Sequence, residues 1–255
     1  MKNIFKFAIV ALSAASLMTS CMKEINPQSN YATSDQVAAA PGAFDMYVSA
    51  ITASMVGSYS FGSSYGYDLG GYPTFMLQWG VMGQDIVIED GSTFNVWYTS
   101  HYALGSQYLI CQMPWTYFYK WINNCNIVLG IIGGEPNDDQ KFGAGTAYAC
   151  RAFCYMDLAR MFAQETYALN KESETVPLVT ETTQDLANNP RATNEVMWAQ
   201  ILSDLDNAEK YLAGYDRGTD TDKFDVSVVY ALKARAYLTM ENYPEAEKYA
   251  KLAQE

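Results

Sequence analysis

Apolar residues in the middle of this 255-residue chain recur at steps of three and four, a pattern that favours helices over other regular structures. The set from Trp115 to Leu129 lines one face of a helix with about 3.6 residues per turn. No alternating run of apolar and polar residues is long enough to predict a sheet. The sequence therefore predicts an all-α fold. The expected helices cover residues 43–56, 115–129, 143–162, 194–212, 227–240 and 243–255.

Two long segments interrupt these helices. Residues 57–75 are rich in Gly, Ser and Tyr and have no helical period, and residues 164–191 separate two of the expected helices. Long loops in a compact domain are usually functional or mobile. The helical scaffold should therefore carry long irregular loops.

The last two expected helices carry the spacing of a tetratricopeptide unit, in which large and small residues mark the contact between two antiparallel helices. A partial second unit pairs the helices expected over 143–162 and 194–212. Such helix pairs bury a face only against neighbours, and the chain ends in mid-helix, so we expect it to be the amino-terminal part of a longer protein. The positions of the full unit are Tyr230, Ala234, Tyr237, Ala246 and Ala253.

The amino terminus has the features of an export signal. Lys2 and Lys6 precede a short apolar stretch over 7–18, which is too short to span a bilayer. Leu17-Met18-Thr19-Ser20-Cys21 resembles the lipobox of bacterial lipoproteins, in which the chain is cut before a cysteine that is then acylated. The alternative is an ordinary cleavage that leaves Cys21 passive. The expected organisation is a signal peptide over 1–20, a lipidated tether over 21–31 and a helical domain over 32–255.

The net charge of the chain argues against nucleic acid as a partner. Acidic residues outnumber basic ones by 28 to 16, and the formal charge of −12 disfavours nucleic-acid binding through a basic surface. Nothing after the signal peptide offers the roughly 18 uninterrupted apolar residues of a membrane helix. The mature protein should therefore be held to a membrane by its lipid alone.

Four cysteines follow Cys21. An even number of cysteines in an exported protein permits disulfides. Cys150 and Cys154, however, lie one helical turn apart, which does not suit a bridge, and no second pair has the spacing of a zinc site. We therefore expect no metal and no cofactor, and four small buried hydrophobic residues at Cys111, Cys125, Cys150 and Cys154.

Aromatic residues are concentrated between Tyr59 and Trp121, where seventeen occur in 63 residues, interleaved with Gly, Ser, Asn and Asp. Sugars stack their C–H faces on such rings, while their hydroxyls bond to amides and carboxylates, so this mixture suits an oligosaccharide platform. The alternative is packing, which we expect for the rings of the predicted helix, Trp115, Tyr119 and Trp121. The candidate ligand contacts are Trp79, Asp85, Asn95, Trp97, Tyr98 and Tyr102.

Catalytic and metal motifs are weak. Gly62-Ser63-Ser64-Tyr65-Gly66 matches a nucleophile elbow but lies in a loop, and His101 is the only histidine available as a base. Asp85, Glu89 and Asp90 are neighbours in sequence, which does not place two carboxylates across a sugar. The acidic run from Asp216 to Asp225 lacks the Gly and Glu of a calcium loop and is expected to be a solvated turn. No catalytic residue is assigned.

An ordered series of short segments runs through the chain and has a recognisable spacing. No single segment is specific, but the order is. The series consists of Asp85-Ile-Val-Ile88, Trp115 to Asn126, Arg151 to Arg160, Val176-Pro-Leu-Val179, Asn189 to Thr193 with Glu195-Val196, Ile201 to Leu205 and Ala231 to Leu238.

This series, together with the lipobox, resembles the SusD/RagB family of nutrient-binding outer-membrane lipoproteins. The resemblance implies a tetratricopeptide-like helical scaffold with an irregular ligand-binding half. It also implies a protein on the outer face of the outer membrane that captures oligosaccharides, or occasionally peptides, for a TonB-dependent transporter of the SusC type. A non-enzymatic binding module is thus the leading hypothesis. A secreted glycan hydrolase and a structural helical-repeat adaptor are the alternatives.

Overall fold

The computed structural model describes residues 40, 42–56, 71–83, 105–107 and 109–254. The predicted signal peptide and tether, and with them Cys21, lie outside these residues. The described helices and strands, in chain order, are α3 (Ala43–Val56), α4 (Tyr72–Met82), α5 (Leu109–Ile132), α6 (Lys141–Phe162), β1 (Glu174–Pro177), β2 (Arg191–Thr193), α7 (Asn194–Leu212), α8 (Val226–Thr239) and α9 (Tyr243–Leu252).

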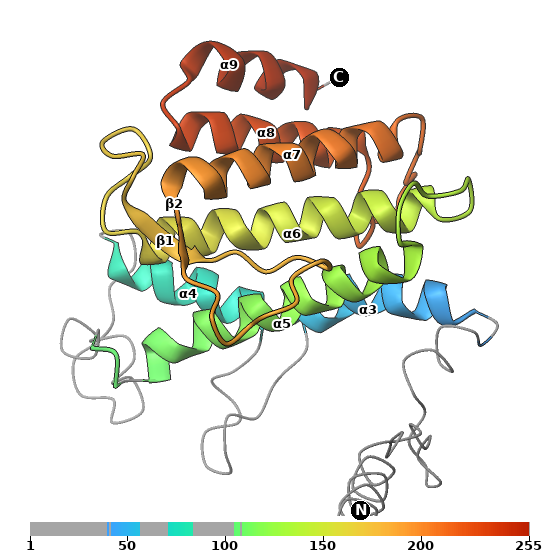
Figure 1. The fold of residues 1–255 in the computed structure, drawn as a ribbon. Coiled ribbons are helices and arrows are strands. Elements are labelled where there is room, and N and C mark those ends of the chain that lie inside the picture. Colours follow the sequence, from blue (N-terminus) through green and yellow to red (C-terminus); the bar gives the residue numbers. More distant parts are fainter. Residues whose placement is uncertain (1–39, 41, 57–70, 84–104, 108, 255) are drawn as a thin grey trace, which may run out of the picture. The chain divides into compact units, whose positions relative to one another are not determined.

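The fold is a stack of helices, as predicted. Helix α6 lies in the middle, between α5 on one side and α7 on the other, and α8 packs against both α7 and α9 (Figure 1). Helix α3 contacts α5 and α6, and the apolar faces of these helices share one core. Its largest buried side chains include Trp121, Trp198 and Phe118, each at most 2% exposed. In the part of the chain that the structure describes, no helix is long and apolar enough to cross a membrane.

Two glycines let α6 approach its neighbours closely. A Cβ atom added to Gly145 would lie 2.5 Å from Cγ of Leu212 on α7, and one added to Gly143 would lie 2.6 Å from the ring of Phe44 on α3. Real Cβ atoms do not come this close to other carbon atoms. Glycine lowers helix propensity, so its presence here is explained by packing rather than by local preference.

The predicted tetratricopeptide pair is present as α8 and α9. Tyr249 of α9 contacts two rings of α8, with its ring centroid 5.6 Å from that of Tyr237 and 6.0 Å from that of Tyr230. Ala246 is buried, as its small position requires, whereas Ala234 is only half-buried. The partial unit is also confirmed, because α6 packs along α7.

Several elements differ from the sequence predictions. Tyr72–Met82 forms α4, although residues 72–75 were expected in a loop; Gly71 has a φ of 72° at its start, and Pro73 occupies the first turn, where its missing N–H is not needed. Helix α5 begins at Leu109 and continues through Pro114 instead of starting at Trp115. Helix packing evidently outweighs the hydrogen bond that Pro114 removes.

A short antiparallel ladder was also not predicted. Strands β1 and β2 pair Glu174 with Thr193 and Pro177 with Arg191. They are too short to show an alternating pattern in sequence, so only their pairing across the intervening loop reveals them. The ladder positions the segment that follows β1 beside α5 and α6.

The cysteines behave largely as predicted. Cys125, Cys150 and Cys154 are buried and form no disulfide, whereas Cys111 is half-buried, so the prediction of four buried residues was wrong at that position. The Sγ atom of Cys150 lies 3.6 Å from the Sδ atom of Met55. These thiols therefore act as small packing groups between α3, α5 and α6.

Candidate ligand-binding pocket

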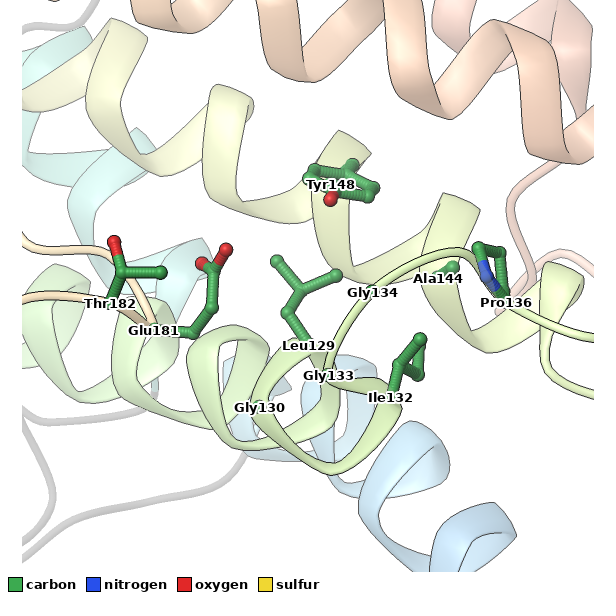
Figure 2. A pocket seen from close by; sticks show the side chains of 10 residues that line it. All are labelled: Leu129, Gly130, Ile132, Gly133, Gly134, Pro136, Ala144, Tyr148, Glu181 and Thr182. Carbon is green, nitrogen blue, oxygen red and sulfur yellow. The ribbon is translucent and has the colours of Figure 1, made fainter.

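A pocket of about 310 Å³ opens between the C-terminal end of α5, the first half of α6 and the segment after β1 (Figure 2). Its walls combine apolar side chains, glycine backbone and a small number of polar groups, which is the usual composition of a ligand site. The lining residues are Leu129, Gly130, Ile132, Gly133, Gly134, Pro136, Ala144, Tyr148, Glu181 and Thr182.

The end of α5 forms one wall of the pocket. The N–H of Gly133 donates to the carbonyl of Leu129 at 3.0 Å, and Gly133 takes a φ of 67°, which glycine adopts without strain. This turn leads the chain through Asn137 and Gln140, whose side chains each accept a hydrogen bond from the other's backbone N–H, into α6. The C-terminal end of α5, which carries the partial negative charge of a helix C-terminus, therefore borders the pocket.

A buried arginine lies beneath the pocket. Nε and Nη2 of Arg151 donate to the two carboxylate oxygens of Asp204, both at 2.8 Å, and Nη1 donates to Oδ1 of Asn126 at 2.8 Å and to Oε2 of Glu181 at 2.5 Å. The side chains of Arg151 and Asp204 are 2% and 1% exposed, whereas that of Glu181 is 24% exposed. Glu181 is thus the member of this cluster that reaches the pocket.

The charges of the cluster do not balance. Burial by itself would lower the pKa of Arg151, but its hydrogen bonds and charge interactions with Asp204 and Glu181 raise that pKa above its ordinary value. The guanidinium is therefore cationic, and the bidentate contact with Asp204 already pairs it with one carboxylate. Glu181 adds a second carboxylate, so the cluster carries a net charge of about −1 when both acids are ionised.

Tyr148 forms another side of the pocket. Its ring centroid lies 5.4 Å from Cζ of Arg151 and 6.1 Å from the ring of Tyr211, which stacks on it. The pKa of Tyr148 is raised, mainly by burial and further by the negative charge of Glu181. The described residues give the Tyr148 hydroxyl no hydrogen-bond partner. A ligand could therefore bond to it.

The structure places one of the sequence candidates for ligand contact. Trp79 lies on α4, is half-buried, and packs edge-on against Tyr72 at 5.9 Å and parallel to Phe75 at 6.3 Å. Its contact with a ligand stays a prediction. The other candidates, Asp85, Asn95, Trp97, Tyr98 and Tyr102, lie outside the described residues, as do His101 and residues 62–66.

The rings expected to pack do so. Trp121 is fully buried, Trp115 packs edge-on against Phe162 at 5.1 Å, and the Tyr119 hydroxyl donates to the carbonyl of Pro177 at 2.5 Å. These contacts explain the aromatic content of α5 without a ligand.

The acidic run after α7 is held by local contacts. Asp225 caps the start of α8 by accepting from the N–H of Val228 at 3.1 Å, and it pairs with Nε of Arg217 at 2.9 Å. Asp220 pairs with Lys223 at 2.5 Å. The structure therefore assigns these carboxylates to capping and surface pairing.

Sequence reasoning missed the pocket and its cluster. Arg151 stands in a helix among Ala, Cys and Phe, and a charged residue on a buried helix face was the available signal. Glu181 gave no signal, because it lies in a loop 30 residues from Arg151. Only the folded chain brings the two together.

A family model described as starch-binding and associating with the outer membrane, of the SusD-like type, matches residues 75–238. The chain belongs to this SusD-like family. The family is a carbohydrate-binding one, and the matched range contains the whole pocket and its buried arginine. The resemblance found in the sequence is thereby confirmed.

Relatives agree with this assignment. The SusD-like protein P38 of Formosa agariphila is 29% identical over 137 residues, which cover 52% of this chain and 24% of that protein. A SusD-like carbohydrate-binding protein from Bacteroides vulgatus superposes with a TM-score of 0.72 and 22% identity over 83% of this chain and 44% of that one. A structure described as a laminarin-binding SusD-like protein gives 0.60 and 19%, over 81% and 41%. The structural likenesses show a shared fold, and the chain spans less than half of each of these relatives.

Proposed function

We propose that this SusD-like protein is a lipid-anchored outer-membrane protein that binds nutrient oligosaccharides at the cell exterior and delivers them to a TonB-dependent transporter of the SusC type. The observation that carries the proposal is the family match, whose description combines starch binding with association with the outer membrane. The lipobox-like residues before Cys21 supply an anchor, and the pocket beside α5 supplies a place for a sugar.

The composition of the pocket favours binding over hydrolysis. Glycoside hydrolysis needs two carboxyl groups held on either side of the scissile bond, roughly 5–10 Å apart. Glu181 is the single acidic residue among those that line this pocket, and it is paired with Arg151. The arrangement suits a site that holds a sugar without cleaving it.

Glycan binding tests the proposal directly. The purified protein should bind at least one oligosaccharide on a glycan array, and the bound glycan should be recovered intact. Cleavage of that glycan would favour the hydrolase alternative. Failure to bind any glycan would leave the structural-adaptor alternative. Binding to peptides alone would change the assigned ligand from an oligosaccharide to a peptide. Co-purification of a TonB-dependent transporter with the tagged protein from outer membranes would test the delivery step separately.

Membrane attachment should depend on one thiol. Cys21→Ala removes the only group that the lipobox would acylate, so the protein should shift from the membrane fraction to the soluble fraction. Cell fractionation and the intact mass of the mature protein measure this shift. Ser20→Thr, which leaves the cysteine in place, serves as the control. A Cys21→Ala variant that stays in the membrane at unchanged mass would contradict the lipoprotein assignment.

A further inference from the structure

We propose that the pocket between α5, α6 and Glu181 binds a single sugar ring that carries a free ammonium group. The inference deepens the proposed function and rests on it. It depends on three properties of the pocket: its surplus negative charge, its size, and the chemistry of its walls.

The first source of negative charge in the pocket is the Glu181 carboxylate. Arg151 is already paired with Asp204 through two hydrogen bonds of 2.8 Å, so the Glu181 carboxylate is not needed to neutralise it. Oε2 of Glu181 contacts Arg151, and the described residues give Oε1 no partner. No lysine, arginine or histidine is among the residues that line the pocket. An ammonium group beside Oε1 would balance the surplus charge.

The C-terminal end of α5 makes the electrostatic potential of the pocket more negative. Gly130, Ile132 and Gly133, in the last turn and just beyond it, line the pocket. A helix C-terminus carries roughly half a negative charge, which favours cations within about one turn. A neutral sugar would gain hydrogen bonds here, but a sugar with an ammonium group would gain hydrogen bonds and charge pairing together.

Size and wall chemistry fit one ring. A volume of about 310 Å³ lies at the lower end of the range for small-molecule sites. Figure 2 shows the Glu181 carboxylate directed away from α5, toward the side of the pocket on which Tyr148 lies. Leu129, Ile132 and Ala144 offer an apolar wall for the C–H face of a ring, and the Tyr148 hydroxyl remains available to a sugar hydroxyl.

Titration of the ¹⁵N-labelled protein with monosaccharides tests the proposal. Glucosamine, at a pH where its amine is protonated, should shift the amide resonances of Gly130, Gly133 and Gly134, and should leave that of Gly218 unchanged. Its affinity should exceed that of glucose and of N-acetylglucosamine by about tenfold, because hydrogen bonds to charged groups are roughly twice as strong as neutral ones. Equal affinities for the three sugars at constant ionic strength would overturn the proposal.

Glu181→Gln tests the source of the preference. The amide keeps an oxygen for Arg151 but removes the surplus charge, so the affinity for glucosamine should fall about tenfold and the preference for glucosamine over glucose should shrink. Glu135→Gln is the matched control, because Glu135 lies on the neighbouring loop, pairs with Lys210 and does not line the pocket. Unchanged glucosamine affinity in Glu181→Gln would overturn the proposal. If that variant does not fold, the comparison of the three sugars on the unaltered protein decides alone.

Two further outcomes separate this proposal from its basis. Tighter binding of lysinamide than of glucosamine at the same glycine amides would overturn the sugar assignment in favour of a peptide ligand. Oligosaccharide binding on the array without any glucosamine shift at these amides would refute the assignment of this pocket as the site of an ammonium sugar. It would leave the proposed function intact. Absence of binding to any saccharide would refute both.

Discussion

Arg151→Met should lower the free energy of unfolding by about 3–5 kcal/mol, the cost of leaving a buried charge without its partner. In the described part of the chain, the variant leaves the Asp204 carboxylate, which is 1% exposed, with one remaining side-chain donor, Nε2 of Gln200 at 2.9 Å. Urea denaturation followed by circular dichroism measures the change as a lower midpoint with an unchanged slope.

The double variant Arg151→Met with Asp204→Leu is the matched control. It removes both buried charges, so it should recover most of the loss, since apolar side chains of similar volume commonly replace buried ion pairs without cost. Glu181 is partly exposed and can be solvated without Arg151. A loss below about 1 kcal/mol in the single variant would mean that water reaches Asp204, and the description of a closed cluster would be wrong.

Trp121→Ala should lower the free energy of unfolding by a similar amount, about 3–5 kcal/mol, because it empties the centre of the aromatic core. The Trp121 side chain is 0% exposed, its ring meets Phe118 edge-on at 5.0 Å, and its Nε1–H donates to the carbonyl of Ser54 at 3.1 Å. The same urea experiment measures the change.

One variant separates packing from hydrogen bonding at Trp121, and a second variant tests whether the core is centred there. Trp121→Phe keeps an aromatic ring and loses the bond to Ser54, so its cost should be smaller, roughly 1–3 kcal/mol. Trp115→Ala removes a half-buried ring and should also cost less than Trp121→Ala. If Trp115→Ala cost more, the core would be centred elsewhere along α5.

Local sequence patterns located most of the helices. Helices α3 and α7 begin and end at the predicted residues, because their starts and ends follow from apolar periodicity and neighbouring turn residues. At α7 the structure shows the local cause, since the Thr193 side chain accepts from the N–H of Val196 at 3.3 Å. Where packing decides instead, as in the continuation of α5 through Pro114, the local pattern misplaced the boundary.

The candidate site was likewise only partly predictable from the sequence. The aromatic residues of α5 could be assigned to the core from their helical spacing, and Trp121 confirms it. The pocket could not be assigned from sequence, because the members of the polar cluster beneath it lie far apart in the chain: Arg151 is 25 residues from Asn126, 30 from Glu181 and 53 from Asp204. No local pattern encodes these distances.

The helical class, the tetratricopeptide spacing of α8 and α9, and the family could all be predicted before the fold was known, because each depends on periodicity or on the order of short segments. Tertiary structure alone decided that Arg151 is buried, that Asp204 neutralises it and that Glu181 is left to face a pocket. The physical reason is that the charge state and the function of a polar side chain depend on its burial and its partners, and both are supplied by segments that are distant in the chain.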